Sequence, residues 1–262
     1  MIYDLQRASM WKRISALLFD IIIFSIIAVG AATLISGAVG YSAHYEGFEV
    51  LRDSYEDRYL EEAGMPTNLK DSEYALLTDE EKKIYDDAIE NAYTALLKDE
   101  DAKYHYSMLI NLSIIIASFS ILSAFLLLEF IVPIIFKNGQ TVGKKIFGVG
   151  IMNVNGVKIS TLSLFIRTVL GKFTVETMIP VITVIMFVFG TASIFNLLIV
   201  FLLLTAQLLS LIISKNNSAI HDLLSQTVAV DLASQMIFDS VEARDSYKRK
   251  IHEEQSKDTR GY

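Results

Sequence analysis

The chain has 262 residues, of which 52% are hydrophobic, and its formal net charge at pH 7 is −7. The mean hydropathy of +0.41 is high for a soluble domain, and the apolar residues form blocks, which indicates a membrane protein. Because the sequence contains no cysteine, disulfides, thiolate catalysis and cysteine metal sites are excluded.

The first apolar block starts near Arg13 and continues past Asp20 to Ile35. Its length is close to the roughly 20 residues that cross a bilayer, and Trp11 precedes it where interfacial aromatic residues occur. We expect residues 1–36 to form a short cytoplasmic start and the first membrane span. The alternative is a cleavable signal peptide, which the acid inside the apolar run disfavours.

Asp20 and Arg13 are the first candidates for a polar site. A carboxylate in hydrocarbon costs about 2.5–3.5 kcal/mol on insertion scales, so it normally faces a partner or a water-filled cavity. Two helical turns separate Asp20 from Arg13 on nearly the same helix face, which is too far for direct contact. Each side chain is therefore expected to pair with another segment, either in a functional site or in a structural ion pair.

Residues 37–107 are strongly acidic. Apolar residues spaced by three and four over residues 48–59 predict an amphipathic helix. After an interruption at Gly64 to Pro66, the run Thr78-Asp79-Glu80-Glu81 predicts a capping box that opens a second helix. We expect a helical insertion with a solvated acidic face, because the acid spacing matches no EF-hand calcium loop.

Three further apolar segments are predicted to span the membrane. The second span covers residues 108–136 and contains Glu129, a second intramembrane acid. The third covers residues 161–190, with an amphipathic entry that carries Arg167, and the fourth covers residues 194–214.

Residues 137–160 are basic and rich in turn residues. The pair Asn155-Gly156 lies between short alternating runs, which predicts a β-hairpin. Val228 to Val230 form a candidate strand that could pair with this hairpin. The run Gly139 to Lys145 has the wrong glycine spacing for a phosphate-binding loop, so nucleotide binding is rejected.

The distribution of lysine and arginine predicts the orientation. The start of the chain, residues 137–160 and the tail at 215–262 carry the bases nearest the spans, so both termini are expected in the cytoplasm and the acidic insertion outside. The fold class is therefore an all-α membrane protein with four transmembrane helices, an extracytoplasmic helical insertion and a small cytoplasmic β-hairpin.

Three separated patches then resemble one family. They are Arg13-x-x-Ala16-x-x-x-Asp20, the run Gly139 to Ile146 with its following Asn-Gly turn, and the run His221 to Val228. In this order and between these spans they resemble the RDD family of bacterial membrane proteins, named for one arginine and two aspartates. The resemblance implies Arg13, Asp20 and Asp222 as the motif residues and a bacterial plasma membrane location. Transport, including cation/proton exchange, has been proposed for that family.

The chemistry of these side chains suggests two groups. Arg13 can clamp a carboxylate, and Asp222 is its expected partner at the cytoplasmic boundary. Asp20 and Glu129 are expected neighbours and candidates for an ion or proton site, because a carboxyl group in a low-dielectric environment exchanges protons more readily near neutral pH. Ala16, Arg167 and His221 are supporting candidates, and His221 is expected to be structural.

Two functions remain open. The first is a non-enzymatic scaffold or accessory protein that binds a partner or lipid, and the alternative is a small transporter that uses the intramembrane acids for cation/proton exchange. The sequence contains no nucleophile with a paired base and no metal constellation, so no catalytic residue, metal or cofactor is expected. The expected partners are the lipid bilayer and either further copies of the chain or a membrane partner protein, and no nucleic acid.

Overall fold

The computed structural model describes residues 5–67, 69–214 and 216–258. Residues 1–4 of the predicted start, residue 68 of the predicted insertion, and residues 215 and 259–262 of the predicted tail lie outside the described residues. The chain divides into two compact units, Thr33–Ile116 as one and Met1–Ala32 with Ala117–Tyr262 as the other. We call them the insertion unit and the main unit and describe each by itself.

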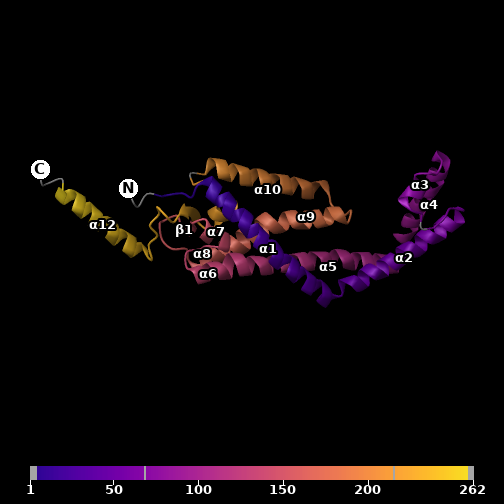
Figure 1. Cartoon of the computed structure of the whole chain (residues 1–262), viewed down its shortest axis with the longest axis horizontal. Coiled ribbons are helices and arrows are strands. Elements are labelled where there is room, and N and C mark those ends of the chain that lie inside the picture. Colours follow the sequence, from indigo (N-terminus) through magenta and orange to yellow (C-terminus); the bar gives the residue numbers. More distant parts are fainter. Residues whose placement is uncertain (1–4, 68, 215, 259–262) are drawn as a thin grey trace. The chain divides into compact units, whose positions relative to one another are not determined.

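Among the described residues, four helical stretches are long and apolar enough to cross a membrane, which confirms the prediction of four long apolar helices. Their elements are α1 (Met10–Val39), then α5 (Glu100–Phe125) with η1 (Leu126–Ile131) and α6 (Val132–Phe136), then α8 (Thr161–Phe165) with η2 (Ile166–Met178) and α9 (Ile179–Val188), and finally α10 (Ile194–Ile213). The segments η1 and η2 are π-helical. Helix α10 lies beside α9 (Figure 1) and buries none of its residues, which suits a helix surrounded by lipid.

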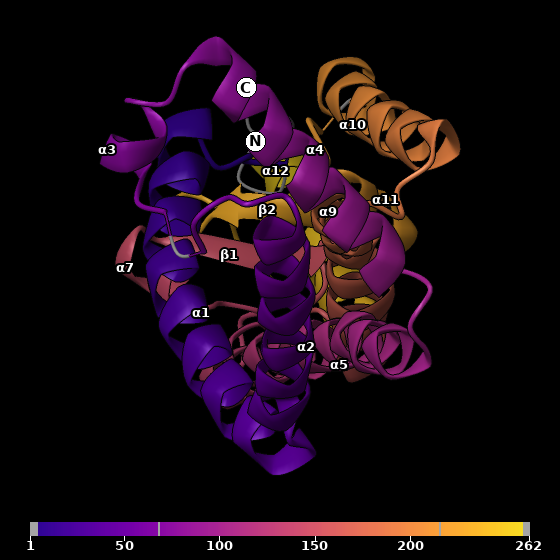
Figure 2. The same ribbon diagram turned by 90° about the vertical axis from the view of Figure 1, so that its right-hand side faces the viewer.

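A small antiparallel sheet in the main unit pairs β1 (Val149–Asn153) with β2 (Thr227–Asp231), as Figure 2 shows. The register places Val149 opposite Asp231 and Asn153 opposite Thr227. Residues before α1 pair with the other edge of β2, where the backbone N–H of Ala8 donates to Ala229 at 3.2 Å.

The sheet pairs β1 with the strand expected at Val228 to Val230, and the turn at Asn155-Gly156 adds only one bridge to it. Met152 and Lys158 form a single isolated bridge across that turn, whereas β1 pairs along its whole length with the distant β2. The reason is burial: both faces of β2 are apolar and covered, with Val228 and Val230 on one side and Ala229 on the other. The segment after the turn instead carries the lysine, which a covered strand would have to desolvate.

Three shorter helices complete the main unit: α7 (Val142–Ile146) lies between the second span and β1, α11 (Ile220–Leu224) precedes β2, and α12 (Val241–Asp258) follows the sheet. Helix α11 packs on η2, and α7 packs against β1. These contacts bring the segments before each strand against the membrane helices.

The insertion unit contains α2 (Tyr41–Glu62), α3 (Asp71–Tyr74) and α4 (Asp79–Leu96). The predicted capping box at the start of α4 is confirmed: the Thr78 hydroxyl accepts the Glu81 N–H at 3.3 Å, and the Glu81 carboxylate accepts the Thr78 N–H at 2.8 Å. Helix α4 packs on α2 and buries Ala88, Ala92 and Leu96. Its acidic side chains remain on the opposite face, as expected for an amphipathic helix.

Candidate functional site

Buried charged side chains gather in the main unit where the spans meet the sheet. We call them the ionic network. It contains four cationic side chains (Arg13, Lys144, Arg167 and Lys172) and four carboxylates (Asp20, Glu129, Glu176 and Asp222), with His221 among them. Exposed fractions of 4% at Asp20 and 1% at Asp222 show how far water is excluded. Charges this deeply buried persist only when they are paired and hydrogen-bonded.

Asp20 of α1 binds the start of α7. One carboxylate oxygen accepts the backbone N–H of Gly143 at 2.8 Å, and the other accepts the Thr141 hydroxyl. Thr141 is itself the N-cap of α7, since its hydroxyl oxygen accepts the Lys144 N–H. The carboxylate therefore lies where a helix presents free N–H groups and partial positive charge.

Ala16 of α1 lies against Gly143 at this contact. It is 2% exposed and lies one helical turn before Asp20. A Cβ atom added to Gly143 would overlap the Ala16 carbonyl oxygen and come within 2.9 Å of the Asp20 carboxylate. Because Gly143 has no side chain, the α7 backbone reaches α1 closely enough to donate its hydrogen bond.

Glu129 lies in the π-helical segment η1 between two lysines. Its carboxylate oxygens lie 2.5 Å from the Lys172 Nζ and 3.2 Å from the Lys144 Nζ. Its backbone carbonyl accepts the Thr168 hydroxyl at 2.9 Å. Pro133, four residues later, has no N–H to offer that carbonyl, so a side chain of η2 replaces the missing donor.

Lys144 links Glu129 to Asp20 through the Thr141 hydroxyl. Its ammonium group also donates to the Thr141 hydroxyl at 3.3 Å, and that hydroxyl donates to Asp20. Asp20 and Glu129 therefore belong to one network but bind different groups. Asp20 accepts from Thr141 and Gly143, whereas Glu129 pairs with Lys144 and Lys172. Burial lowers the pKa of Lys144 to about 8; Lys172 adds to this, while Glu129 opposes it.

Asp222 of α11 has Arg167 of η2 as its nearest cation. The Arg167 guanidinium donates to one Asp222 oxygen and to the Thr227 hydroxyl at 2.7 Å. Arg13, the partner expected from the sequence, is farther away: its Nη2 lies 3.8 Å from the other Asp222 oxygen. Burial opposes ionisation of Asp222, but the charge and hydrogen bond of Arg167, together with its other neighbours, outweigh burial and hold the pKa of this carboxyl below its ordinary value.

His221 packs against Glu176 of η2. Its Nδ1 lies 2.8 Å from one Glu176 oxygen, and its backbone N–H donates to the other at 2.9 Å. Burial first, and then the charge of Arg167, lower the pKa of His221. The imidazole is therefore neutral near pH 7, and its observed contacts position α11 on η2.

Several network residues were not among the sequence candidates, namely Thr141, Lys144, Thr168, Lys172 and Glu176. The sequence spacing could have indicated three of them. Thr168, Lys172 and Glu176 recur every four residues and so share one face of a helix. Lys144 offered no such signal, since lysines near a membrane boundary are ordinarily interfacial.

The network is internally satisfied within the part of the chain that the structure describes. There, no buried side-chain nitrogen or oxygen lacks a hydrogen-bond partner. Over the same residues, no group of three or more histidine or acidic side chains is arranged to hold a metal ion. The cations that neutralise Asp222 and Glu129 are thus arginine and lysine side chains.

Comparison with known proteins gives one match. A family model described as the RDD family matches residues 7–226, which include every member of the ionic network. No curated protein and no solved structure matches the chain.

Proposed function

This chain belongs to the RDD family, and we propose its function from that membership and from the ionic network. It is a multi-pass membrane protein surrounded by a lipid bilayer. Our proposal is that it works without catalysis, as a scaffold or accessory protein of the bacterial plasma membrane, and binds a partner protein.

The observation that carries this proposal is the balance of the ionic network. Glu129 and Asp222 face the four cationic side chains, whereas Asp20 and Glu176 bind a hydroxyl, backbone N–H groups and the His221 imidazole. All of these partners are supplied by the chain itself. A network of this kind joins α1, η1 and η2 to the sheet and α11, and it favours a single arrangement of the helices. Such rigidity suits a platform on which another protein assembles.

The partner surface that we propose is the acidic face of the insertion unit. Helix α4 exposes Asp79, Glu80, Asp87 and Glu90, and the same unit exposes the apolar side chains of Leu76 and Tyr93. Acidic groups around apolar anchors fit a partner with a basic, partly apolar surface. With both termini in the cytoplasm, as the lysine and arginine bias supports, that partner binds outside the cell.

Crosslinking in intact cells tests the scaffold. A variant carrying Glu80→Gln, Asp87→Asn and Glu90→Gln is expected to lose a crosslinked partner that the unchanged protein captures. A variant with Glu242→Gln, Glu253→Gln and Glu254→Gln on α12 removes three acids elsewhere and should keep it. Equal capture of the partner by both variants would show that the acidic face is not the docking surface.

The alternative is cation/proton exchange, and one observation favours it. Asp20, Thr141, Lys144, Glu129 and Lys172 form a continuous chain of hydrogen bonds and ion pairs between α1 and η2. The pKa of Lys144, about 8, lies near physiological pH. If Lys144 loses its proton, Glu129 keeps Lys172 as its cationic partner, and its other carboxylate oxygen can accept a cation from solution. Proton release and cation binding are thereby coupled.

Proteoliposomes with an internal pH dye separate these functions. For a scaffold, an imposed sodium or potassium gradient moves no more protons than in empty vesicles. Cation-dependent proton movement that Glu129→Gln abolishes, and that the exposed-site control Glu62→Gln leaves intact, would replace the scaffold with the exchanger. Flux that Asp20→Asn leaves unchanged would exclude Asp20 from the exchange site.

A further inference from the structure

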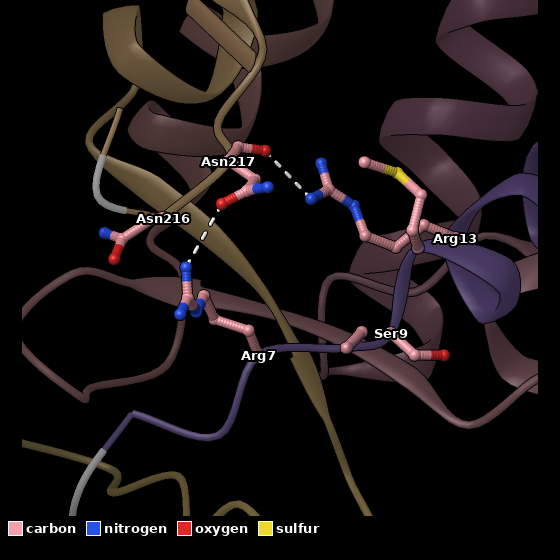
Figure 3. A pocket seen from close by; sticks show the side chains of 7 residues that line it. Arg7, Ser9, Arg13, Asn216 and Asn217 are labelled. Carbon is pink, nitrogen blue, oxygen red and sulfur yellow. Dashed lines mark hydrogen bonds between the residues drawn. The ribbon is translucent and has the colours of Figure 1, made fainter. Parts of the chain in front are cut away.

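A cavity of about 290 Å³ opens beside the start of α1, at the edge of the ionic network, of which Arg13 is a member. It is lined by residues 7–10, Arg13, Asn216 and Asn217. Of these described residues, two are arginines and none is acidic. Figure 3 shows both guanidinium groups reaching toward Asn217, Arg7 from below and Arg13 from the right of the view.

Asn217 orients the two arginines. Its side-chain oxygen accepts from the Arg7 Nη1 at 3.1 Å, and its backbone carbonyl accepts from the Arg13 Nη1 at 2.9 Å. The residue has a φ angle of 49°, in the left-handed region that asparagine tolerates better than most residues. Both guanidinium groups are thereby held at the cavity.

The carboxylate that faces Arg13 decides how strongly this guanidinium is engaged. The carboxylate nearest to Arg13 belongs to Asp222, 3.8 Å away, and Arg167 binds that group more closely. Asp222 therefore binds only weakly the N–H donors of Arg13 that face away from Asn217. Guanidinium groups of this kind bind phosphate oxygens in pairs.

The depth of the cavity identifies the source of such a phosphate. Trp11 follows the lining residue Met10 and is 79% exposed, as an aromatic side chain at a bilayer surface is. One to two turns farther along α1, Leu17 and Leu18 are exposed apolar side chains that suit hydrocarbon. The cavity thus opens at the level of lipid headgroups.

We infer that this cavity binds the phosphate group of an anionic membrane lipid, with Arg7 and Arg13 as its ligands. The site goes beyond the proposed function and does not depend on it, since a scaffold and an exchanger would hold the lipid equally. Free inorganic phosphate shares the chemistry, so the test must separate it from the lipid.

Trp11 reports on the cavity directly, because the sequence contains a single tryptophan. The full-length protein in zwitterionic detergent is titrated with short-chain phosphatidylglycerol, with short-chain phosphatidylcholine and with inorganic phosphate, and tryptophan emission is recorded. A saturable change is expected with phosphatidylglycerol alone. Saturation by inorganic phosphate at equal or lower concentration would overturn the lipid assignment.

Arg7→Gln is the decisive variant, because Arg7 is exposed and lies outside the buried ion pairs. Loss of one charge-assisted contact should weaken phosphatidylglycerol binding about tenfold. The matched control Arg249→Gln changes an exposed arginine of α12 and should bind as the unchanged protein does. Equal affinities of the two variants, or no saturable change in the unchanged protein, would overturn the site.

Discussion

At the residue scale, the buried carboxylate of Asp222 faces two guanidinium groups. The side chains of Asp222 and Arg167 are 1% and 4% exposed, so neither can be solvated if the other is lost. A buried ion pair adds little to stability when intact, because its desolvation cost offsets its attraction, but removing one member leaves an uncompensated charge.

Asp222→Asn is therefore expected to lower the free energy of unfolding by about 3–5 kcal/mol. Asp231→Asn serves as the control, since Asp231 pairs with the partly exposed Lys12 and should lose less than about 1 kcal/mol. Denaturant unfolding in detergent, followed by circular dichroism, measures both. Similar losses at the two positions would contradict the buried-pair account.

The neutral imidazole of His221 makes stability depend on pH. Its pKa is lowered in the folded protein, so below about pH 6.5 the unfolded chain binds a proton that the folded chain resists. Stability is present above that value and falls as the pH drops from 7 to 5.

His221→Gln should flatten this fall while leaving the step at lower pH, where Asp222, whose pKa is also lowered, becomes protonated in the unfolded chain. Thermal unfolding in detergent across pH 4–8 measures the difference between the two proteins. Parallel curves would show that His221 does not govern this range.

At the element scale, the π-helical segments determine where charged side chains meet. Glu129 lies in η1, while Arg167, Lys172 and Glu176 lie in η2. In the widened turns, carbonyl groups do not accept the i+4 N–H hydrogen bond of an ordinary α-helix. Pro133 removes a further N–H donor. The Thr168 hydroxyl, fully buried, satisfies the Glu129 carbonyl across the two segments.

Thr168→Val keeps the shape and removes this donor. We expect a loss of about 1–3 kcal/mol, the usual cost of an unpaired buried polar group. Thr174→Val is the control, because its hydroxyl binds a carbonyl of its own helix at an exposed position and should cost much less. In a Pro133→Ala background, where a backbone N–H is restored, Thr168→Val should cost less stability. An unchanged loss would contradict the idea that the Thr168 hydroxyl replaces the missing N–H of Pro133.

The contact of α7 with α1 is equally specific. Gly143→Ala places a methyl group against the backbone of Ala16, which cannot move as a side chain can. We expect a loss of about 1–3 kcal/mol from overpacking. At Gly30, where a Cβ would meet nothing within 4 Å, alanine should be neutral or favourable. Thermal unfolding of both variants tests the difference, and equal stability would contradict close packing at Gly143.

At the scale of the whole molecule, the proposed orientation places the insertion unit and the tail on opposite sides of the bilayer. The chain has no cysteine, so single cysteines can report on each side without background. Ser72 in α3 and Ser256 in α12 are both exposed.

A membrane-impermeant maleimide added to intact cells should label Ser72→Cys and not Ser256→Cys. After the cells are opened, both should react. Labelling of Ser256→Cys in intact cells would reverse the orientation, and with it the outside location of the acidic surface.

The sequence by itself determined the elements with strong local signals. Four apolar stretches of sufficient length, the capping box at Thr78 and the family patches around Arg13, Asp20 and Asp222 are all readable along the chain, because each depends on neighbours within a few turns. The resemblance drawn from those patches is confirmed by the family match over residues 7–226.

The pairing of charges was decided by the tertiary structure. Whether Asp222 meets Arg13 or Arg167 depends on how α11 packs on η2, and the donors to Asp20 depend on a glycine contact 123 residues away. β1 likewise pairs along its whole length with the distant β2 and by a single bridge with the segment after its own turn, because β2 offers apolar side chains to both covered faces. Local sequence specifies which groups must be compensated, while the packing of distant segments selects the groups that compensate them.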